Sequence, residues 1–99
     1  KLINKQHKTT IKKEFYYYFL NIHHKNIIRY RNIFKKQQNC QIIMNYYEQD
    51  LYYYFTDEQN FKKLTNDDLK LIIYQILCGI NYLSKYNIYH ADIKLENII

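Results

Sequence analysis

The sequence predicts a small α+β domain, on three observations. Two stretches carry apolar residues at helical spacing, one near the start of the chain and a longer one after residue 64. Between them lie two segments rich in β-branched and aromatic residues, separated by a polar turn. The chain has 99 residues, of which 47% are apolar, so it can build one modest core and is too apolar for a disordered tail.

The first helix is expected within residues 8–22, KTTIKKEFYYYFLNI. Its apolar positions recur at helical spacing and define one stripe: Ile11, Phe15, Tyr18, Phe19 and Ile22. Glu14 lies at the edge of this stripe, three residues after Ile11 and four before Tyr18. We therefore expect the Glu14 carboxylate to need a cationic partner.

Two antiparallel strands are expected next. The segments IIRYRNIF, residues 27–34, and CQIIMNYY, residues 40–47, have the β-branched and aromatic composition of strands. The polar KKQQN between them is typical of a hairpin turn.

A short helical turn and then a long helix complete the expected elements. The segment 64–86, LTNDDLKLIIYQILCGINYLSKY, gives the clearest periodicity in the chain. We expect six side chains of one stripe to be buried: Leu69, Ile72, Ile73, Ile76, Ile80 and Leu83. Thr65 and Asp68 have the spacing of a capping box at its start.

Charge, hydropathy and cysteines limit the partners and the compartment. The formal net charge of +6 allows an anionic partner, but the lysines are spread along the chain, which favours an ordinary solvated basic surface and no nucleic acid partner. No apolar run approaches the roughly 20 residues of a membrane span, so we expect no membrane partner. Cys40 and Cys78 lie far apart inside apolar runs, which favours reduced, buried thiols and an intracellular protein, cytoplasmic or nuclear.

The segment HADIKLENII, residues 90–99, resembles the catalytic loop of eukaryotic protein kinases, H-R-D-x-K-x-x-N followed by apolar residues. Three further segments support the resemblance. HKNIIRY is similar to the entry into the family's fourth strand, IIMNYYEQDL to its fifth strand and hinge, and LIIYQILCGINYLSKYNIYH to the long helix before the loop. The resemblance implies a partial protein-kinase-like fold: the small-lobe helix, strands 4 and 5, the hinge, a helical turn, the long helix and the catalytic loop.

The resemblance also implies lobes and catalytic roles. Residues 1–44 would end the small lobe, 45–50 would form the hinge and 51–99 would begin the large lobe. By the family pattern Asp92 is the catalytic base, Lys94 the cation at the transferred phosphate and Asn97 a magnesium ligand. His90 is then structural: it would pack beneath the loop and hold its backbone. Lys94, two residues after Asp92, favours the serine/threonine class, with ATP and Mg²⁺ as cofactors and a protein hydroxyl as substrate.

The resemblance implies a part in nucleotide binding for five further residues. Met44 would be the gatekeeper, and backbone groups of Asn45 and Tyr47 would read the adenine. Asp50 would hydrogen-bond the ribose or cap the following helical turn, and both interpretations stay open. Glu14 would pair with the lysine that holds the α- and β-phosphates.

Several departures from the family pattern sustain an alternative, a degenerate kinase-like binding or scaffold module. Ala91 replaces the arginine, Leu95 replaces the usual proline, and Glu14 lies one residue further from HKNI than is typical. No glycine-rich loop, strand lysine before Glu14 or D-F-G is found in these residues. We expect the 99 residues alone to be an inactive central fragment. Small-molecule phosphotransferases, which usually lack this lysine and hinge, are a minor alternative.

Overall fold

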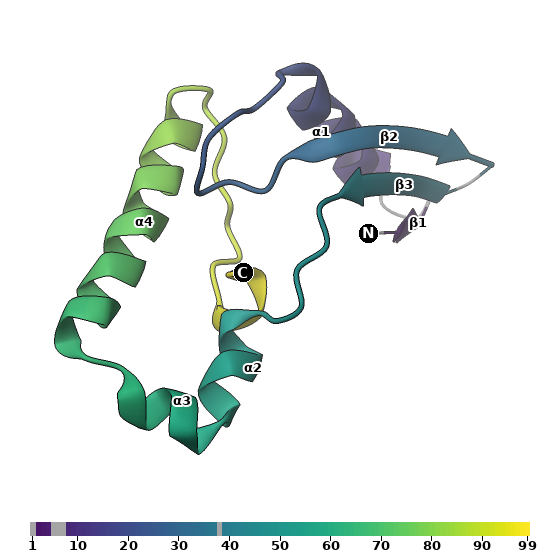
Figure 1. The fold of residues 1–99 in the computed structure, drawn as a ribbon. Coiled ribbons are helices and arrows are strands. Elements are labelled where there is room, and N and C mark those ends of the chain that lie inside the picture. The colour runs from purple at the N-terminus through teal and green to yellow at the C-terminus, as the bar shows by residue number, and fades with distance from the viewer. Residues whose placement is uncertain (1, 5–7, 38) are drawn as a thin grey trace. The chain divides into compact units, whose positions relative to one another are not determined.

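The computed structural model describes residues 2–4, 8–37 and 39–99. The chain divides into two compact units, Lys1–Asn45 and Tyr46–Ile99 (Figure 1). The first combines a sheet with a helix and the second is helical, so the α+β composition is confirmed. Among the described residues no helix is both long enough and apolar enough to cross a bilayer.

The first unit contains a three-stranded antiparallel sheet and one helix. Strand β2 (Tyr30–Lys36) and strand β3 (Asn39–Met44) form the expected hairpin, and helix α1 (Lys8–Phe19) lies within the expected range. Strand β1 (Leu2–Asn4) pairs with the other edge of β3, giving the order β1-β3-β2. We did not expect β1, because three residues are too few to show a strand periodicity.

Left-handed backbone conformations mark the ends of these elements. Asn21, just beyond α1, has φ 50°, and Gln37, in the turn between β2 and β3, has φ 51°. Asn tolerates this region better than most residues, whereas Gln has no such advantage. The turn of the hairpin therefore lies where the sequence predicts it, but Gln37 adopts there a left-handed conformation that its side chain does not favour.

The core of the first unit lies between α1 and the sheet. Ile33, Cys40 and Ile42 are buried and form one cluster, and Phe15 and Tyr18 of α1 pack against it. Two residues of the predicted stripe, Phe15 and Tyr18, therefore face the sheet, and Ile22, beyond the end of α1, is buried as well.

One member of the predicted α1 stripe is not in the core. Phe19 is 75% exposed. Its ring lies 6.3 Å from that of Phe15 and 5.6 Å from that of Tyr18, so it contacts aromatic rings of its own helix. The side chain of Ile11 lies outside the described part of the structure.

The second unit is a succession of helices. Helix α2 (Leu51–Thr56) and helix α3 (Glu58–Lys63) are short, α4 (Asn66–Ser84) is long, and a 3₁₀ turn, η2 (Leu95–Asn97), lies near its end. The predicted capping box is confirmed: the Asp68 amide donates to Thr65 Oγ1 over 3.1 Å, and the Thr65 amide donates to Asp68 Oδ2 over 2.9 Å.

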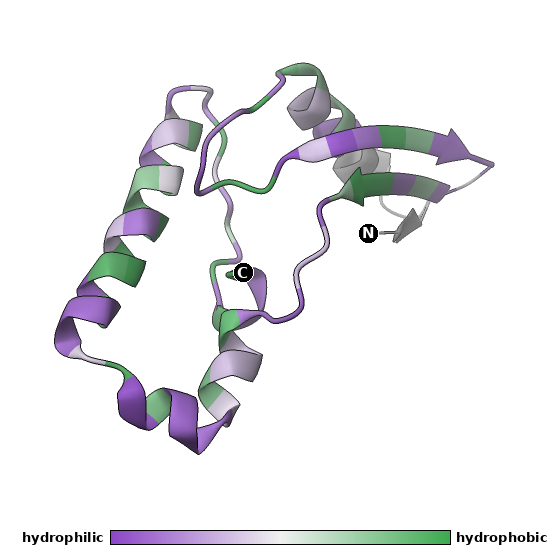
Figure 2. Ribbon diagram, viewed as in Figure 1, coloured by the Kyte–Doolittle hydropathy of each residue, from purple (hydrophilic) through white to green (hydrophobic). Residues whose placement is uncertain are grey.

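The predicted burial of the α4 stripe is confirmed at Leu83 and is wrong for its exposed members. Leu83 is buried at 6% exposure, but Ile73 is 57% exposed, Leu69 and Ile80 are also exposed, and Ile72 and Ile76 are half-buried. Figure 2 shows apolar residues recurring along the whole length of α4. Within the second unit, which the structure describes throughout, no other helix packs extensively on α4, so that unit alone offers most of the stripe no surface against which to be buried.

Candidate active site

The segment after α4 is fixed at both ends by backbone hydrogen bonds. At its start the Ile88 amide donates to the Leu83 carbonyl over 3.1 Å, which turns the chain away from the helix. At its end the Leu51 amide, in the first turn of α2, donates to the Ile98 carbonyl over 2.7 Å. Figure 1 shows η2 beside the start of α2, at the C-terminus. The loop is thus held between α4 and α2.

Three residues predicted to be catalytic come together on this loop. The Asn97 side-chain amide donates to the Asp92 backbone carbonyl over 2.8 Å and to Asp92 Oδ2 over 3.3 Å. Lys94 Nζ lies 3.5 Å from the same Oδ2. Two donors on one oxygen orient the carboxylate, so Oδ1 is the atom left to accept a proton or a hydrogen bond.

The site is open to solvent. The Asp92 side chain is 66% exposed and that of Lys94 is 51% exposed. An ion pair this exposed contributes about 0 to 1 kcal/mol to stability. The Asp92–Lys94 pair is therefore weak as a structural support, and both charges stay accessible to a ligand.

His90 holds the loop backbone, as predicted. Its Nδ1 accepts a hydrogen bond from the Asp92 amide over 3.2 Å. This bond holds the backbone that carries the Asp92 carboxylate. The expectation that His90 packs beneath the loop is wrong, since the residue is exposed. The intervening Ala91 has φ 62°, a left-handed conformation that costs a residue with a Cβ roughly 1 to 2 kcal/mol.

The predicted hinge residues are divided between the units. Asn45 belongs to the first unit, where its Oδ1 accepts from Arg31 Nε over 3.0 Å. Tyr47 and Asp50 belong to the second, and Tyr47 is exposed. Of the two interpretations of Asp50, the structure shows the N-cap: its Oδ1 accepts from the Tyr53 amide over 2.7 Å. Its Oδ2 is not needed for that cap.

Glu14 is half-buried in the first unit and has a partner that the sequence did not indicate. The hydroxyl of Tyr30 donates to Glu14 Oε2. Burial, and next the hydrogen bond to Glu14, raise the pKa of the Tyr30 phenol far above its usual range, so the hydroxyl stays protonated. The two residues are 16 positions apart, too far for any local periodicity to relate them.

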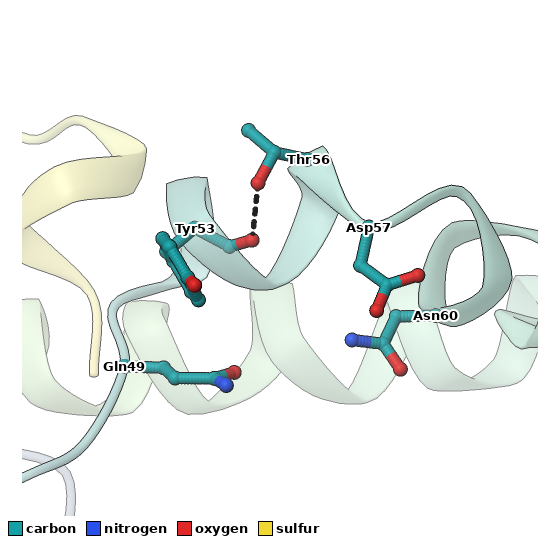
Figure 3. Close-up of a pocket in the computed structure, with 5 residues that line it drawn as sticks. All are labelled: Gln49, Tyr53, Thr56, Asp57 and Asn60. Carbon is teal, nitrogen blue, oxygen red and sulfur yellow. Dashed lines mark hydrogen bonds between the residues drawn. The ribbon is translucent and has the colours of Figure 1, made fainter.

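A polar pocket of about 290 Å³ lies elsewhere in the second unit (Figure 3). Its lining comes from the segment before α2, from α2 and α3, and from the residue between these helices; it consists of Gln49, Tyr53, Thr56, Asp57 and Asn60. None of the predicted site residues lines it. Thr56 Oγ1 donates to the Tyr53 carbonyl and Asp57 caps α3. Two polar residues of the pocket lining are therefore already hydrogen-bonded to the backbone of α2 or α3.

The magnesium expectation can be tested against the donor atoms. In the described ranges no three His, Cys, Asp or Glu side chains gather as a metal site would require. Asn97 nevertheless fits its predicted role: its amide nitrogen faces Asp92, which leaves Oδ1 directed elsewhere as an oxygen donor of the kind Mg²⁺ prefers.

Comparison with known proteins decides the family. The model of the protein kinase domain matches residues 1–99, the whole chain. This chain belongs to the protein kinase domain family. Its relatives in that family carry serine/threonine kinase names. It is 37% identical over 78 residues to the serine/threonine-protein kinase VHS1 of Saccharomyces cerevisiae, a match that covers 78% of this chain and 16% of the yeast protein.

Two further kinases show the same relationship at lower identity. The human serine/threonine-protein kinase MAK is 27% identical over 79% of this chain, and the rat serine/threonine-protein kinase ICK is 28% identical over 79%. The chain spans only 12% of the length of each of these two relatives. The predicted resemblance to serine/threonine protein kinases is therefore confirmed.

Proposed function

We propose that the complete protein is a serine/threonine kinase that transfers the γ-phosphoryl group of ATP to a protein hydroxyl. The observation that supports it best is the arrangement of Asp92, Lys94 and Asn97 on one fixed loop. Phosphoryl transfer needs an oriented base and neutralisation of charge on the phosphate oxygens, and little else from the protein. A carboxylate, an ammonium and an amide oxygen donor are the groups that this chemistry requires.

Asp92 is the proposed base. Its Oδ1 accepts the proton of the substrate hydroxyl as the hydroxyl oxygen attacks the γ-phosphorus and the bond to ADP breaks. The Asn97 amide keeps the carboxylate in place from the other side. Lys94, 3.5 Å from Oδ2, brings a positive charge next to the position where the phosphate would lie.

Magnesium is the proposed cofactor together with ATP. Asn97 would contribute Oδ1 to the ion, as the direction of its amide permits. A magnesium ion held there would supply positive charge to neutralise the negative charge that develops on the phosphate oxygens.

The nucleotide contacts belong to the same proposal. Backbone groups of Asn45 and Tyr47 would read the adenine edge, and Glu14 would pair with the lysine that holds the α- and β-phosphates. Asp50 would reach the ribose through Oδ2, since Oδ1 caps α2. We also propose an intracellular location, cytoplasmic or nuclear, which the free thiols of Cys40 and Cys78 support.

The test compares the full-length protein with its Asp92→Asn variant. We expect kcat for protein phosphorylation to fall by about 10²- to 10⁴-fold, with ATP affinity nearly unchanged, because a base acts mainly in the transition state. Glu96→Gln is the matched control, because it removes an exposed carboxylate of the same loop and should leave kcat intact.

Two outcomes would contradict the proposal. If the full-length protein binds ATP but phosphorylates no protein, it is a degenerate binding or scaffold module. If Asp92→Asn is as active as the parent, Asp92 is not the base. Phosphorylation of a small metabolite in place of protein would support the small-molecule phosphotransferase alternative.

A further inference from the structure

One partner of Glu14 within the first unit is a well-held hydroxyl. Tyr30 is the first residue of β2, and its hydroxyl donates to Oε2 of Glu14 on α1. The bond therefore connects the helix directly to the sheet on which it packs. It engages one oxygen of a carboxylate that can accept hydrogen bonds at two.

Packing fixes the position of the Tyr30 ring. Tyr30 packs against the buried cluster of Ile33, Cys40 and Ile42. The ring of Tyr17 lies 4.8 Å from it at an interplanar angle of 52°. A tyrosine has two side-chain torsions, so a ring held on two sides leaves its hydroxyl little freedom.

The composition of residues 1–45 makes a neutral partner of Glu14 significant. Glu14 is the single acidic residue between residues 1 and 45, a range that also contains ten basic ones. These are Lys1, Lys5, Lys8, Lys12, Lys13, Lys25, Arg29, Arg31, Lys35 and Lys36. Lysine side chains are long and flexible, so attraction to them alone would not define one orientation of the carboxylate. A hydroxyl donor on a packed ring defines one orientation of the Glu14 carboxylate, and because the hydroxyl is neutral the carboxylate keeps its negative charge.

We propose that Tyr30 is the positioning residue of Glu14, holding Oε2 so that Oε1 is presented to the cation that binds the nucleotide phosphates. The inference rests on the proposed function, in which Glu14 pairs with that cation. Tyr30 acts through Glu14 and does not itself contact the nucleotide.

The test is a double-mutant cycle in the full-length protein. We expect Tyr30→Phe, which removes only the hydroxyl, to lower kcat/KM for ATP about tenfold, as loss of a hydrogen bond to a charged group would. In a Glu14→Gln background the same change should have little further effect. Tyr17→Phe is the matched control: it removes the neighbouring hydroxyl, which donates to the Ile28 carbonyl over 3.3 Å, and should leave kcat/KM near the parent value.

Three results would overturn the inference. An unchanged kcat/KM in Tyr30→Phe shows that the hydroxyl does not position Glu14. An equal loss in both backgrounds shows that Tyr30 acts only through packing. A gain in kcat/KM shows that the hydroxyl holds Glu14 away from its cation.

Nucleotide binding separates this inference from the proposed function. If the full-length protein transfers no phosphate, the proposed activity is refuted. The Mg–ATP affinities of the parent, the two single variants and the double variant still measure whether the effects of Tyr30→Phe and Glu14→Gln depend on each other. Non-additive losses of affinity support the positioning role, and additive or absent losses refute it.

Discussion

Removing the hydroxyl of Thr65 is expected to loosen the first turn of α4. Thr65 Oγ1 accepts from the Asp68 amide over 3.1 Å and also donates to Asp68 Oδ2 over 2.9 Å, so Thr65→Ala deletes both hydrogen bonds. Loss of an N-cap hydroxyl costs about 0.5 to 2 kcal/mol. Thr65 and Asp68 are both exposed, so water can replace part of what is lost, and we expect about 1 kcal/mol.

Amide hydrogen exchange measures this change where it occurs. A loss of about 1 kcal/mol speeds exchange of the protected Asp68 amide roughly fivefold, while amides in the last turns of α4 should change much less. Thr65→Ser is the matched control, because serine keeps the hydroxyl that caps the helix. If Ala and Ser variants exchange equally fast, the hydroxyl does not cap α4 and the reasoning is refuted.

The same cap predicts a dependence on pH. The backbone amide of Thr65, and then its hydroxyl, hold the pKa of the Asp68 carboxyl below its usual range. A carboxyl with a lowered pKa in the folded state stabilises the fold at pH values above its ordinary pKa, and this contribution is lost as the pH falls through the lowered value. Protection of the first turn should therefore decline only below about pH 4. In Asp68→Asn the decline over that acidic range should disappear.

Three other changes test the first unit. Ile42→Ala should lower the free energy of unfolding by about 2 to 5 kcal/mol, because Ile42 is buried between α1 and the sheet, and chemical denaturation would measure it. Gln37→Val should destabilise the hairpin by roughly 1 to 2 kcal/mol, whereas Gln37→Asn should not, since φ is 51° there and a β-branched side chain tolerates it least. Cys40 is fully buried, and burial raises the pKa of its thiol, so a thiol reagent should modify the half-buried Cys78 first, as peptide mass spectrometry would show. Equal modification rates at the two cysteines would contradict the burial of Cys40.

The sequence predicted most reliably what depends on neighbouring residues. The periodicity of residues 64–86 predicted α4, and the Thr65 and Asp68 spacing predicted its cap. Burial was predicted less well, as Ile73 shows: helical spacing puts a residue on a face, but burial needs another element packed on that face. Periodicity has no information about that second element.

The two parts of the proposed site differ for the same reason. Asp92, Lys94 and Asn97 lie within six residues of one another, and their mutual contacts are made across a single loop, so a short motif is enough to predict them. Glu14 and Tyr30 meet only because α1 packs on the sheet through Phe15 and Tyr18, and no motif contains both residues. The residues of the proposed catalytic loop could therefore be singled out from the sequence, whereas the contact between Tyr30 and Glu14 required the structure. A survey of kinase sequences for the loop motif alone would not detect a change at Tyr30, although we expect that change to lower kcat/KM for ATP.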